Sequence, residues 1–445
     1  MEKVLEKTLE KITPTANESE GEQRIIRIIT KKLEKFDVIP VLVGSTAKGT
    51  DLRGDKDIDI FIMFGQDVSR EKLEKKGLEI GKAVFKEIGA KYEIDYAEHP
   101  YVKGFYKDYD IEIVPCYSGK RIMSSVDRTP FHTRYVRRKL RENPALRNGM
   151  RLLKQFMKGI EVYGAEAKVQ GFSGYLVELL VIHYGSFMKV LKAAAGWSLN
   201  QVLDPEKQWK NPEEARYFFT NANLIVIDPV DKNRNVAAAV SMQCLSEFII
   251  AAKEFLENPS EEYFFPKEPK LLSKKELSEK IEKRGTKLVA VIFRHKKLNE
   301  NSLYSQLRRT IKSLTDEIET FGFKFFRSGF WSNEKNLSLI ILEFEVFKLP
   351  EVMHKTGPPI DQDPKNQEKF IEKYKKDKPY VKDGRWVVDT KRKFREIEKL
   401  MPEILEERKG FGKDLKAVEE IYFLTGKKIL DTEEKEFYRF LGKFL

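Results

Sequence analysis

Cysteine and histidine are scarce in this sequence. Cys116 and Cys244 are the only cysteines among 445 residues, and they lie far apart in the chain. They cannot build a disulfide framework or a cysteine-based zinc site, and such sparse usage is typical of a reducing cytosol. The five histidines are scattered and show no metal-ligand spacing. We therefore expect neither a structural zinc site nor a disulfide scaffold.

Long hydrophobic runs are also missing. The most apolar stretch, GYLVELLVIHYG (174–185), is too short to span a bilayer and carries Glu178 and His183. The N-terminal segment MEKVLEKTLEKI is charged throughout, which is not typical of a signal peptide. The sequence thus predicts a soluble, cytoplasmic protein without a membrane partner.

Positive charge, in contrast, is in excess. Hydrophobic residues make up 41% of the chain, enough for packed cores, and charged residues make up 34%. Lys and Arg exceed Asp and Glu by twelve, and the pI is about 9.2. A basic protein of this size most often binds a polyanion, with nucleic acid as the first candidate and a membrane surface as the second. A Lys/Glu-rich solvated surface of a heat-tolerant protein is the alternative.

The first third of the chain alternates helix and strand signals. A capping box at Ser19–Glu22, followed by Ile25, Ile26, Ile29 and Leu33, predicts a helix over about 20–35. Another helix is expected over 70–88, and strands are expected over 38–43, 57–64, 91–98 and 109–117, with a loop after the first strand. This order predicts a small mixed α/β domain that ends near residue 145.

The remaining sequence divides at a Pro- and charge-rich linker over 257–270. Before it, apolar helices are expected near 173–196 and 236–257. Beyond it, we expect strands over 286–295, 323–331 and 336–349, a helix over 302–322, a polar loop over 354–367 and basic helical material to 445. The prediction is an α+β multidomain protein with domains 1–145, 146–258 and 259–445.

Two expected strands carry paired carboxylates. Alternate residues of a strand face the same way, so Asp57 and Asp59 share one face of DIDIFIMF, and Asp110 and Glu112 share one face of YDIEIVPCY. If these strands are neighbours, three or four carboxylates converge. Such a cluster stays ionised only around cations, and two Mg²⁺ ions are the common solution in nucleotidyl transfer. The alternative is that each pair is merely the polar half of an edge strand.

A Gly44-Ser45 turn lies thirteen residues before Asp57, where backbone N–H groups and a hydroxyl could hold phosphate oxygens. The segment is not a P-loop, because Thr50 and Asp51 stand where that motif requires Lys and Ser or Thr. We expect phosphates to be held by other groups.

These motifs resemble a known family. Their order resembles that of the nucleotidyltransferase superfamily, which includes DNA polymerase β: Gly44-Ser45, then Asp57 and Asp59, then one acidic residue in a later strand. Longer segments resemble the archaeal, class I CCA-adding enzymes, which are tRNA nucleotidyltransferases. The similar segments follow one another in the same order over nearly the whole chain, and the resemblance fades in the last sixty or so residues. The segments are AEHPYVKG (97–104), IVPCY (113–117), SSVDRTPFHTRYV (124–136), residues 151–187, DPVDKNRNVAA (228–238) and RGTKLVAVIFR (284–294).

The resemblance implies a polymerase-β-like catalytic head, a helical neck and a C-terminal α+β body and tail. It further implies template-independent addition of C, C and A to the 3′ end of tRNA from CTP and ATP, with pyrophosphate released and two Mg²⁺ ions as cofactors. The tRNA would be gripped at its acceptor stem and TΨC arm, and a homodimer stays open. The alternatives are a poly(A)- or oligoadenylate-type transferase and a non-catalytic RNA-binding protein that retains the fold.

The resemblance also implies residue roles. Asp57, Asp59 and Glu112 match the metal-binding carboxylates, with Asp110 as a rival for the third place. The triphosphate and base contacts match Ser45, Lys48, His132, Lys154, Tyr163 and Arg234, with Arg234 expected in a turn-rich segment just before the N-terminus of a helix. The alternative is a surface arginine in a loop. Glu98, His99 and Arg294 would lie near the tRNA 3′ end.

Overall fold

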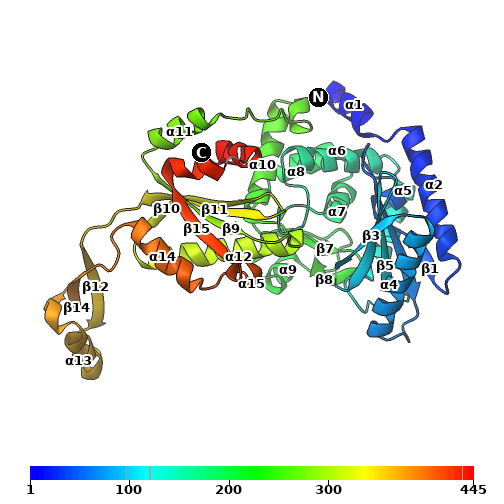
Figure 1. The fold of residues 1–445 in the computed structure, drawn as a ribbon. Helices are drawn as coiled ribbons and strands as arrows, with labels where there is room; N and C mark the ends of the chain where they lie inside the picture. The colour runs from blue at the N-terminus through cyan, green and yellow to red at the C-terminus, as the bar shows by residue number, and fades with distance from the viewer. Residues whose placement is uncertain (97, 120–121, 433) are drawn as a thin grey trace. The chain divides into compact units, whose positions relative to one another are not determined.

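The computed structural model describes residues 1–96, 98–119, 122–432 and 434–445 of the chain (Figure 1). It divides into two compact units, 1–267 and 268–445. The finer division at residues 145 and 258 stays a prediction. Among the described residues, no single helix is long and apolar enough to cross a membrane. The helices α7 (Gly174–Tyr184) and α8 (Phe187–Ala194) together reach that length and composition, with a 92° bend between them.

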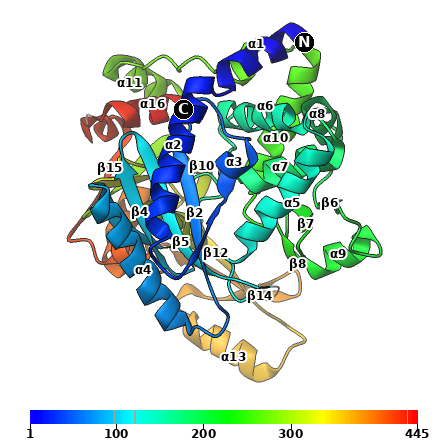
Figure 2. The same ribbon diagram turned by 90° about the vertical axis from the view of Figure 1, so that its right-hand side faces the viewer.

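The first unit begins with a five-stranded sheet in the order β1-β2-β5-β4-β3. Only the central pair, β2 with β5, is parallel; the other neighbours are antiparallel. The strands are β1 (Ile39–Leu42), β2 (Asp57–Phe64), β3 (Lys91–Tyr96), β4 (Pro100–Tyr106) and β5 (Tyr109–Tyr117), and the helices of this part are α1 (Glu2–Ile12), α2 (Ala16–Leu33), α3 (Gly44–Lys48) and α4 (Arg70–Glu87). Figure 2 shows α2 and α4 on the same side of the sheet.

The alternation of side chains along the strands decides which face of this sheet is buried in the core. Ile58, Ile60 and Ile111 are fully buried or nearly so and pack with side chains of α2 and α4, such as Ile29 and Phe85. The opposite face of the same strands carries the carboxylates. The predicted strand over 57–64 is confirmed residue for residue, and β5 likewise covers 109–117.

Three local predictions for this part are wrong. Helix α2 begins at Ala16 with a capping box of Thr15 and Glu18, so Ser19 lies inside the helix. An earlier Thr-x-x-Glu pattern already satisfies the first N–H groups. The expected loop after β1 starts with the one-turn helix α3. Strand β3 ends at Tyr96, and residue 97 lies outside the described residues. In contrast, Glu98 and His99 lie, as expected, in the turn of the antiparallel β3–β4 hairpin, directly before Pro100.

The rest of the first unit is mainly helical, with α5 (Arg128–Glu142), α6 (Leu146–Gly159), α7 (Gly174–Tyr184), α8 (Phe187–Ala194) and α10 (Met242–Glu257). Phe156 lies at the centre of its core, with ring centroids 5.5–5.7 Å from Phe187, Phe255 and Phe264. The helix expected over 173–196 is interrupted at Gly185, which has a φ of +87°. The helix expected over 236–257 begins at Met242.

This helical part also contains a small sheet that the sequence did not predict. It consists of β6 (Gln201–Leu203), β7 (Leu224–Asp228) and β8 (Asp231–Asn235), next to α9 (Pro212–Phe218); the single turn η1 (Glu261–Tyr263) follows later. β7 and β8 form a tight hairpin in which Asp228 pairs with Asp231. The hairpin lies in DPVDKNRNVAA, where a loop was expected, because its strands are too short and too polar to show a period-2 pattern.

The second unit contains a four-stranded antiparallel sheet in the order β10-β11-β9-β15 and a three-stranded sheet in the order β12-β14-β13. The strands are β9 (Lys287–Arg294), β10 (Lys324–Ser332), β11 (Leu337–Val346), β12 (Val352–Pro359), β13 (Tyr380–Lys382), β14 (Arg385–Lys391) and β15 (Glu420–Thr425). The helices are α11 (Lys274–Lys283), α12 (Glu300–Thr320), α13 (Pro364–Lys373), η2 (Lys375–Asp377), α14 (Ile397–Glu407), α15 (Lys413–Lys416), η3 (Gly426–Thr432) and α16 (Lys435–Phe444).

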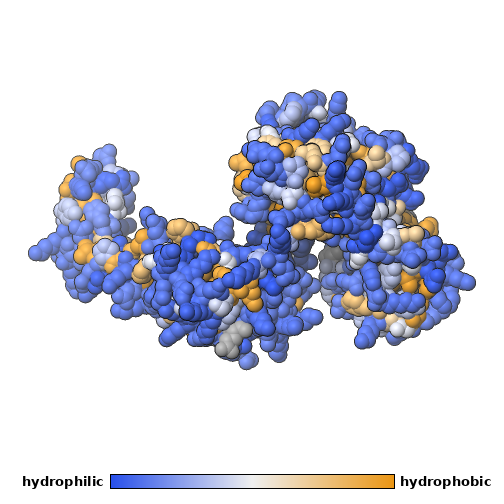
Figure 3. Space-filling model, turned by 90° about the horizontal axis from the view of Figure 1, so that it is seen from above, coloured by the Kyte–Doolittle hydropathy of each residue, from blue (hydrophilic) through white to orange (hydrophobic). Residues whose placement is uncertain are grey.

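Strands β9 to β11 and helix α12 confirm the elements expected over 286–349. The expected loop over 354–367 is wrong, because it holds most of β12 and the start of α13, and the expected helical tail contains β13, β14 and β15. The face seen in Figure 3 is mostly hydrophilic with scattered apolar patches, as the high charged fraction implies.

Candidate active site

Four carboxylates lie side by side on one face of the first sheet. In the parallel pairing of β2 with β5, Asp57 is opposite Asp110 and Asp59 is opposite Glu112. The prediction that these two strands are neighbours is confirmed. All four carboxylates line a pocket of about 300 Å³. The pocket wall also includes Gly44, Ser45, Lys48, Lys154, Tyr163, Gly174 and Glu178.

Burial and mutual repulsion disfavour the ionised carboxylates. Burial raises the pKa of Asp57 and of Asp59, and nearby acidic groups raise each further. Burial and the Asp59 charge raise the pKa of Glu112 to about 7. The Lys103 ammonium lies 3.1 Å from Asp110, and the Tyr101 hydroxyl donates to Glu112 over 3.2 Å. The cluster therefore carries more negative charge than its neighbours balance.

The donor set fits a hard divalent cation. Carboxylate oxygens are the ligands that such ions prefer, and a cation would relieve the repulsion between Asp59 and its neighbours. As placed in the structure, no group of three or more His, Cys, Asp or Glu side chains within the described ranges could hold a metal ion. Glu112 instead accepts a hydrogen bond from the Tyr101 hydroxyl, and Asp110 forms an ion pair with Lys103. The side chains that would hold a cation are therefore Asp57 and Asp59, with Glu112 or Asp110 beside them.

Gly44 allows the chain to pass directly over Asp59. Its φ is +74°, and a Cβ at this position would lie 2.1 Å from Asp59 Oδ2. A side chain here would meet both backbone strain and a direct clash with the carboxylate. Ser45, the next residue, lies at the wall of the same pocket. The Gly-Ser pattern thus places a backbone segment against the second carboxylate.

Lys48 and Lys154 are buried cations at the pocket wall. Lys48 Nζ lies 2.7 Å from Glu178 Oε2, and the Thr50 hydroxyl donates to Glu178 Oε1 over 2.8 Å. Lys154 donates to the Thr50 carbonyl over 3.1 Å and lies 4.0 Å from Asp55. Burial lowers the pKa of Lys154. Both cations therefore border the space in front of the carboxylates.

Tyr163 closes another side of the pocket. Its hydroxyl oxygen lies 2.9 Å from the position that a Cβ on Gly174 would take, so the glycine at the start of α7 makes room for the ring. Burial raises the pKa of the Tyr163 phenol, which keeps it protonated as a hydrogen-bond donor.

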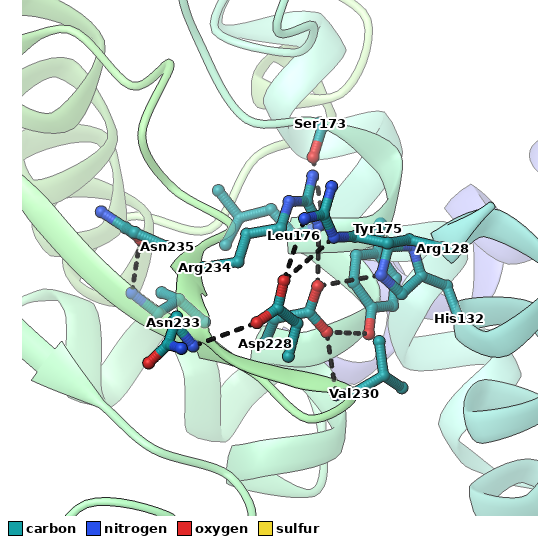
Figure 4. Close-up of polar contacts among 12 residues, drawn as sticks. Arg128, His132, Ser173, Tyr175, Leu176, Asp228, Val230, Asn233, Arg234 and Asn235 are labelled. Atoms are coloured by element: carbon teal, nitrogen blue, oxygen red, sulfur yellow. Dashed lines mark hydrogen bonds and ion pairs between the residues drawn. The ribbon is translucent and has the colours of Figure 1, made fainter. Parts of the chain in front are cut away.

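His132 and Arg234 meet at a residue that the sequence did not single out (Figure 4). His132 Nε2 lies 2.9 Å from Asp228 Oδ2, and Arg234 Nη1 donates to the same oxygen over 2.8 Å. Arg234 belongs to strand β8 and α10 begins only at Met242, so its expected place just before a helix is wrong. Asp228 and Glu178 have no pattern in the sequence that marks them, because their side-chain partners lie 6 to 130 residues away.

Glu98 and His99, two of the three residues predicted to lie near the RNA end, are not among the described residues that line this pocket, and the third, Arg294, belongs to the second unit. The Glu98 carboxylate accepts a hydrogen bond from the Ser125 backbone N–H. His99 is 4% exposed, and its ring nitrogens have no hydrogen-bond partner among the described residues. Arg294 ends β9 in the second unit, 3.3 Å from Glu420, and its side chain is half exposed.

Three family models match consecutive parts of the chain. A nucleotidyltransferase domain matches residues 23–136, the second domain of tRNA nucleotidyltransferase matches 148–265, and the C-terminal domain of the CCA-adding enzyme matches 284–425. The carboxylates of β2 and β5 fall within the first match.

Curated relatives are similar over most of the chain. The CCA-adding enzyme of Archaeoglobus fulgidus is 38% identical over 398 residues, which cover 88% of this chain and 87% of that protein. The CCA-adding enzyme of Methanothermobacter thermautotrophicus is 35% identical over 432 residues, covering 92% and 89%. That of Methanosarcina mazei is 37% identical over 418 residues, covering 89% and 88%.

Solved structures give weaker likenesses. The Cid1 poly(U) polymerase bound to Mg 3′-dATP aligns with a TM-score of 0.48 and 13% identity over 58% of this chain and 94% of that chain. CdnC from E. coli MS115-1 with ATP aligns with a TM-score of 0.45 and 16% identity over 59% and 94%.

Proposed function

The chain belongs to the family of CCA-adding enzymes, and from this premise we propose that the carboxylates of β2 and β5 carry its reaction. The activity is CCA addition to tRNA. In the proposed chemistry the tRNA 3′-oxygen attacks the α-phosphate of CTP, twice, and then of ATP. A bond to the α-phosphate forms, the bond to the β-phosphate breaks, and pyrophosphate and the hydroxyl proton leave.

The observation that supports these roles is the direct opposition of Asp59 and Glu112 in the parallel β2–β5 pair. Asp57, Asp59 and Glu112 are the proposed metal ligands and catalytic residues, with Asp110 next to them. Two bound Mg²⁺ ions would neutralise the charge that develops on the attacking and leaving oxygens. The chain's own part is to hold acidic oxygens rigidly, because β2 and β5 lie at the centre of the sheet.

Basic and hydroxyl groups around the pocket are proposed to position the triphosphate. Lys48 and Lys154 supply charge from the wall of the pocket, and Ser45 and Tyr163 supply hydroxyl donors. His132 and Arg234 are proposed to contact the nucleotide from the β7–β8 hairpin side, where Arg234 is about one-third exposed. Positioning of this kind lowers the barrier mainly by removing the entropy cost of alignment.

The three family matches support a head over 1–145, a neck over 146–258 and a body with tail over 259–445. We propose that the third part contacts the acceptor stem and TΨC arm through its cations, such as Arg294. Glu98 and His99 are proposed to lie near the RNA 3′ end. The homodimer stays an open alternative.

A poly(A)- or oligoadenylate-type transferase is not favoured, because the C-terminal match is to the CCA-adding enzyme. A non-catalytic RNA-binding protein would be expected to lack a carboxylate of the set, and all four are in place.

The function is tested by single-nucleotide incorporation into tRNA that lacks CCA. We expect the full-length chain with Mg²⁺ to add two C residues from CTP and then one A from ATP. Asp59→Asn should lower the rate by about 10³-fold or more, since several kcal/mol of transition-state stabilisation are lost. Asp108→Asn, at an exposed turn where it pairs with Lys56, is the control. Long A tracts, or indifference to CTP, would reject the proposal.

A further inference from the structure

A fully buried carboxylate connects two of the proposed nucleotide contacts. Asp228 is the last residue of β7, and its side chain has no exposed surface. Besides His132 and Arg234, it accepts hydrogen bonds from the Tyr175 hydroxyl and from the Val230 backbone N–H, both over 3.1 Å. The four donors come from α5, α7, β8 and the hairpin turn. The two oxygens of the Asp228 carboxylate have about four acceptor sites, and these four hydrogen bonds occupy all of them. The carboxylate is therefore held in one orientation.

The negative charge of Asp228 is balanced by its neighbours, unlike the excess negative charge of the carboxylates in the pocket. Burial by itself would raise the pKa of Asp228, but hydrogen bonds from His132 and Arg234 lower it below its usual value. Asp228 is therefore a permanent negative charge against the Arg234 guanidinium. The His132 ring also stacks on Tyr175, with centroids 3.9 Å apart and planes inclined by 18°. His132 is thus fixed at one ring nitrogen and across one ring face.

The same hairpin is docked at a second point that does not involve Arg234. Asp231, the first residue of β8, lies 3.0 Å from both Nε and Nη2 of Arg128. Arg128 and His132 are one turn apart on α5, and Asp228 and Asp231 are paired across the hairpin turn. Asp231 therefore docks the hairpin on α5. Asp228 docks it as well, but also binds the guanidinium of Arg234.

The cluster adjoins the catalytic pocket through the start of α7. Gly174 lines the pocket next to Tyr163, and the next residue, Tyr175, donates to Asp228. Among the described residues, Arg234 donates one hydrogen bond, from Nη1 to Asp228. A guanidinium has five N–H donors, so most of them stay available for a ligand while the group is held in place.

We propose that Asp228 is a positioning residue for nucleotide selection, which fixes the Arg234 guanidinium and the His132 imidazole relative to each other before CTP or ATP binds. The inference rests on the proposed function. Binding to a preformed pair avoids the cost of ordering two side chains at each addition. Without the buried carboxylate, the hairpin would still fold back on β7, but Arg234 would be free to adopt several rotamers.

Asp228→Asn and Asp231→Asn in the full-length chain form a matched pair for the test. Each removes one carboxylate from the same hairpin and should lower the melting temperature. We expect only Asp228→Asn to raise the KM for CTP and ATP by about tenfold, the effect of one hydrogen bond to a charged group, with a smaller change in kcat. It should also reduce the preference for CTP over ATP at the first addition. For Asp231→Asn, both KM values should stay within about twofold.

A double mutant separates positioning from general destabilisation. If Asp228 acts through Arg234, Asp228→Asn combined with Arg234→Gln should have the same nucleotide KM as Arg234→Gln alone. Additive effects, or equal KM changes in the two Asn variants, would overturn the inference.

If Asp228→Asn does not fold, Tyr175→Phe is the alternative variant. It removes one of the four hydrogen bonds to Asp228 and should raise the KM for CTP and ATP by a few fold; an unchanged KM would then reject the inference. Failure of the wild-type chain to add C to tRNA would instead reject the proposed function.

Discussion

The carboxylates of the candidate site alternate with aliphatic residues along their strands. Ile58 and Ile60 are buried behind Asp57 and Asp59, and Ile111 and Ile113 are buried next to Glu112. The aliphatic side chains fix the strands in the core, and the carboxylates must then project to the other face. Their mutual repulsion is a cost of this arrangement. A residue-scale consequence is that cation binding, protonation and folding are linked.

This linkage predicts a pH-dependent stability. The pKa of Glu112 is about 7 in the folded chain, against an ordinary value of 4.5. Between these pH values the folded chain binds more protons than the unfolded chain, so the free energy of unfolding falls as pH rises. In EDTA, the melting temperature of the wild type should fall more over this window than that of Glu112→Gln. Excess Mg²⁺ should reduce the difference, because the cation binds the ionised form.

The control for this prediction is Glu93→Gln, at an exposed position on β3 of the same sheet. It should show the wild-type pH profile. If Glu112→Gln also has the wild-type profile, with and without Mg²⁺, the assignment of Glu112 to the cation site loses its thermodynamic support.

Glu178 provides a second prediction at the residue scale. It is 2% exposed and holds both Lys48 and Thr50. Glu178→Gln would leave the Lys48 ammonium buried without a countercharge, and we expect the free energy of unfolding in urea to fall by about 3 kcal/mol. Glu213→Gln removes an exposed partner of Arg216 and should cost less than about 0.5 kcal/mol. Equal losses would show that the Lys48 pair is no stronger than a surface ion pair.

At the scale of elements, the site depends on how strands and turns meet. β2 and β5 were predicted with their observed bounds because the period-2 pattern is strong in both, and their pairing followed from the paired carboxylates. The β7–β8 hairpin was not predicted, because β8 (DKNRN) has no apolar alternation. Its position is decided by ion pairs to α5, more than ninety residues earlier in the chain.

The first residue of α3 gives a prediction with a matched control. Gly44 and Gly89 have similar φ values, +74° and +70°, but a Cβ on Gly44 would clash with Asp59, whereas no atom lies within 4 Å of a Cβ on Gly89. Both Gly→Ala variants should lose about 1 kcal/mol of stability from backbone strain. Only Gly44→Ala should also lose nucleotide incorporation, by about 10²-fold. Comparable activity of the two variants would show that the Asp59 carboxylate can move without loss.

For the whole molecule, charge and division into units are the dominant features. The net charge of +12 is that of a chain which binds a polyanion, and the two units each have their own core. The first unit contains the complete carboxylate pocket. The second contains cations such as Arg294, which ends strand β9 of an antiparallel sheet.

A test at this scale is the salt dependence of tRNA binding. If about six phosphates are contacted, affinity should fall by about 10³-fold between 50 mM and 200 mM salt. Arg294→Gln should lower affinity and reduce the slope of log K against log salt by about one if Arg294 contacts a phosphate. Lys275→Gln, on the exposed face of α11, changes the charge equally and should leave the slope nearly unchanged. A slope near zero in the wild type would contradict phosphate binding.

The sequence by itself determined the central strands of the first sheet, the family of the chain and which acidic residues share one face of those strands, because these depend on local alternation and on motifs that are contiguous or nearly so. Tertiary structure alone decided that Glu178 neutralises Lys48 and that Asp228 joins His132 to Arg234. These contacts depend on which helices and hairpins pack together, and a buried charge finds its partner by proximity in space. No spacing along the chain encodes that proximity.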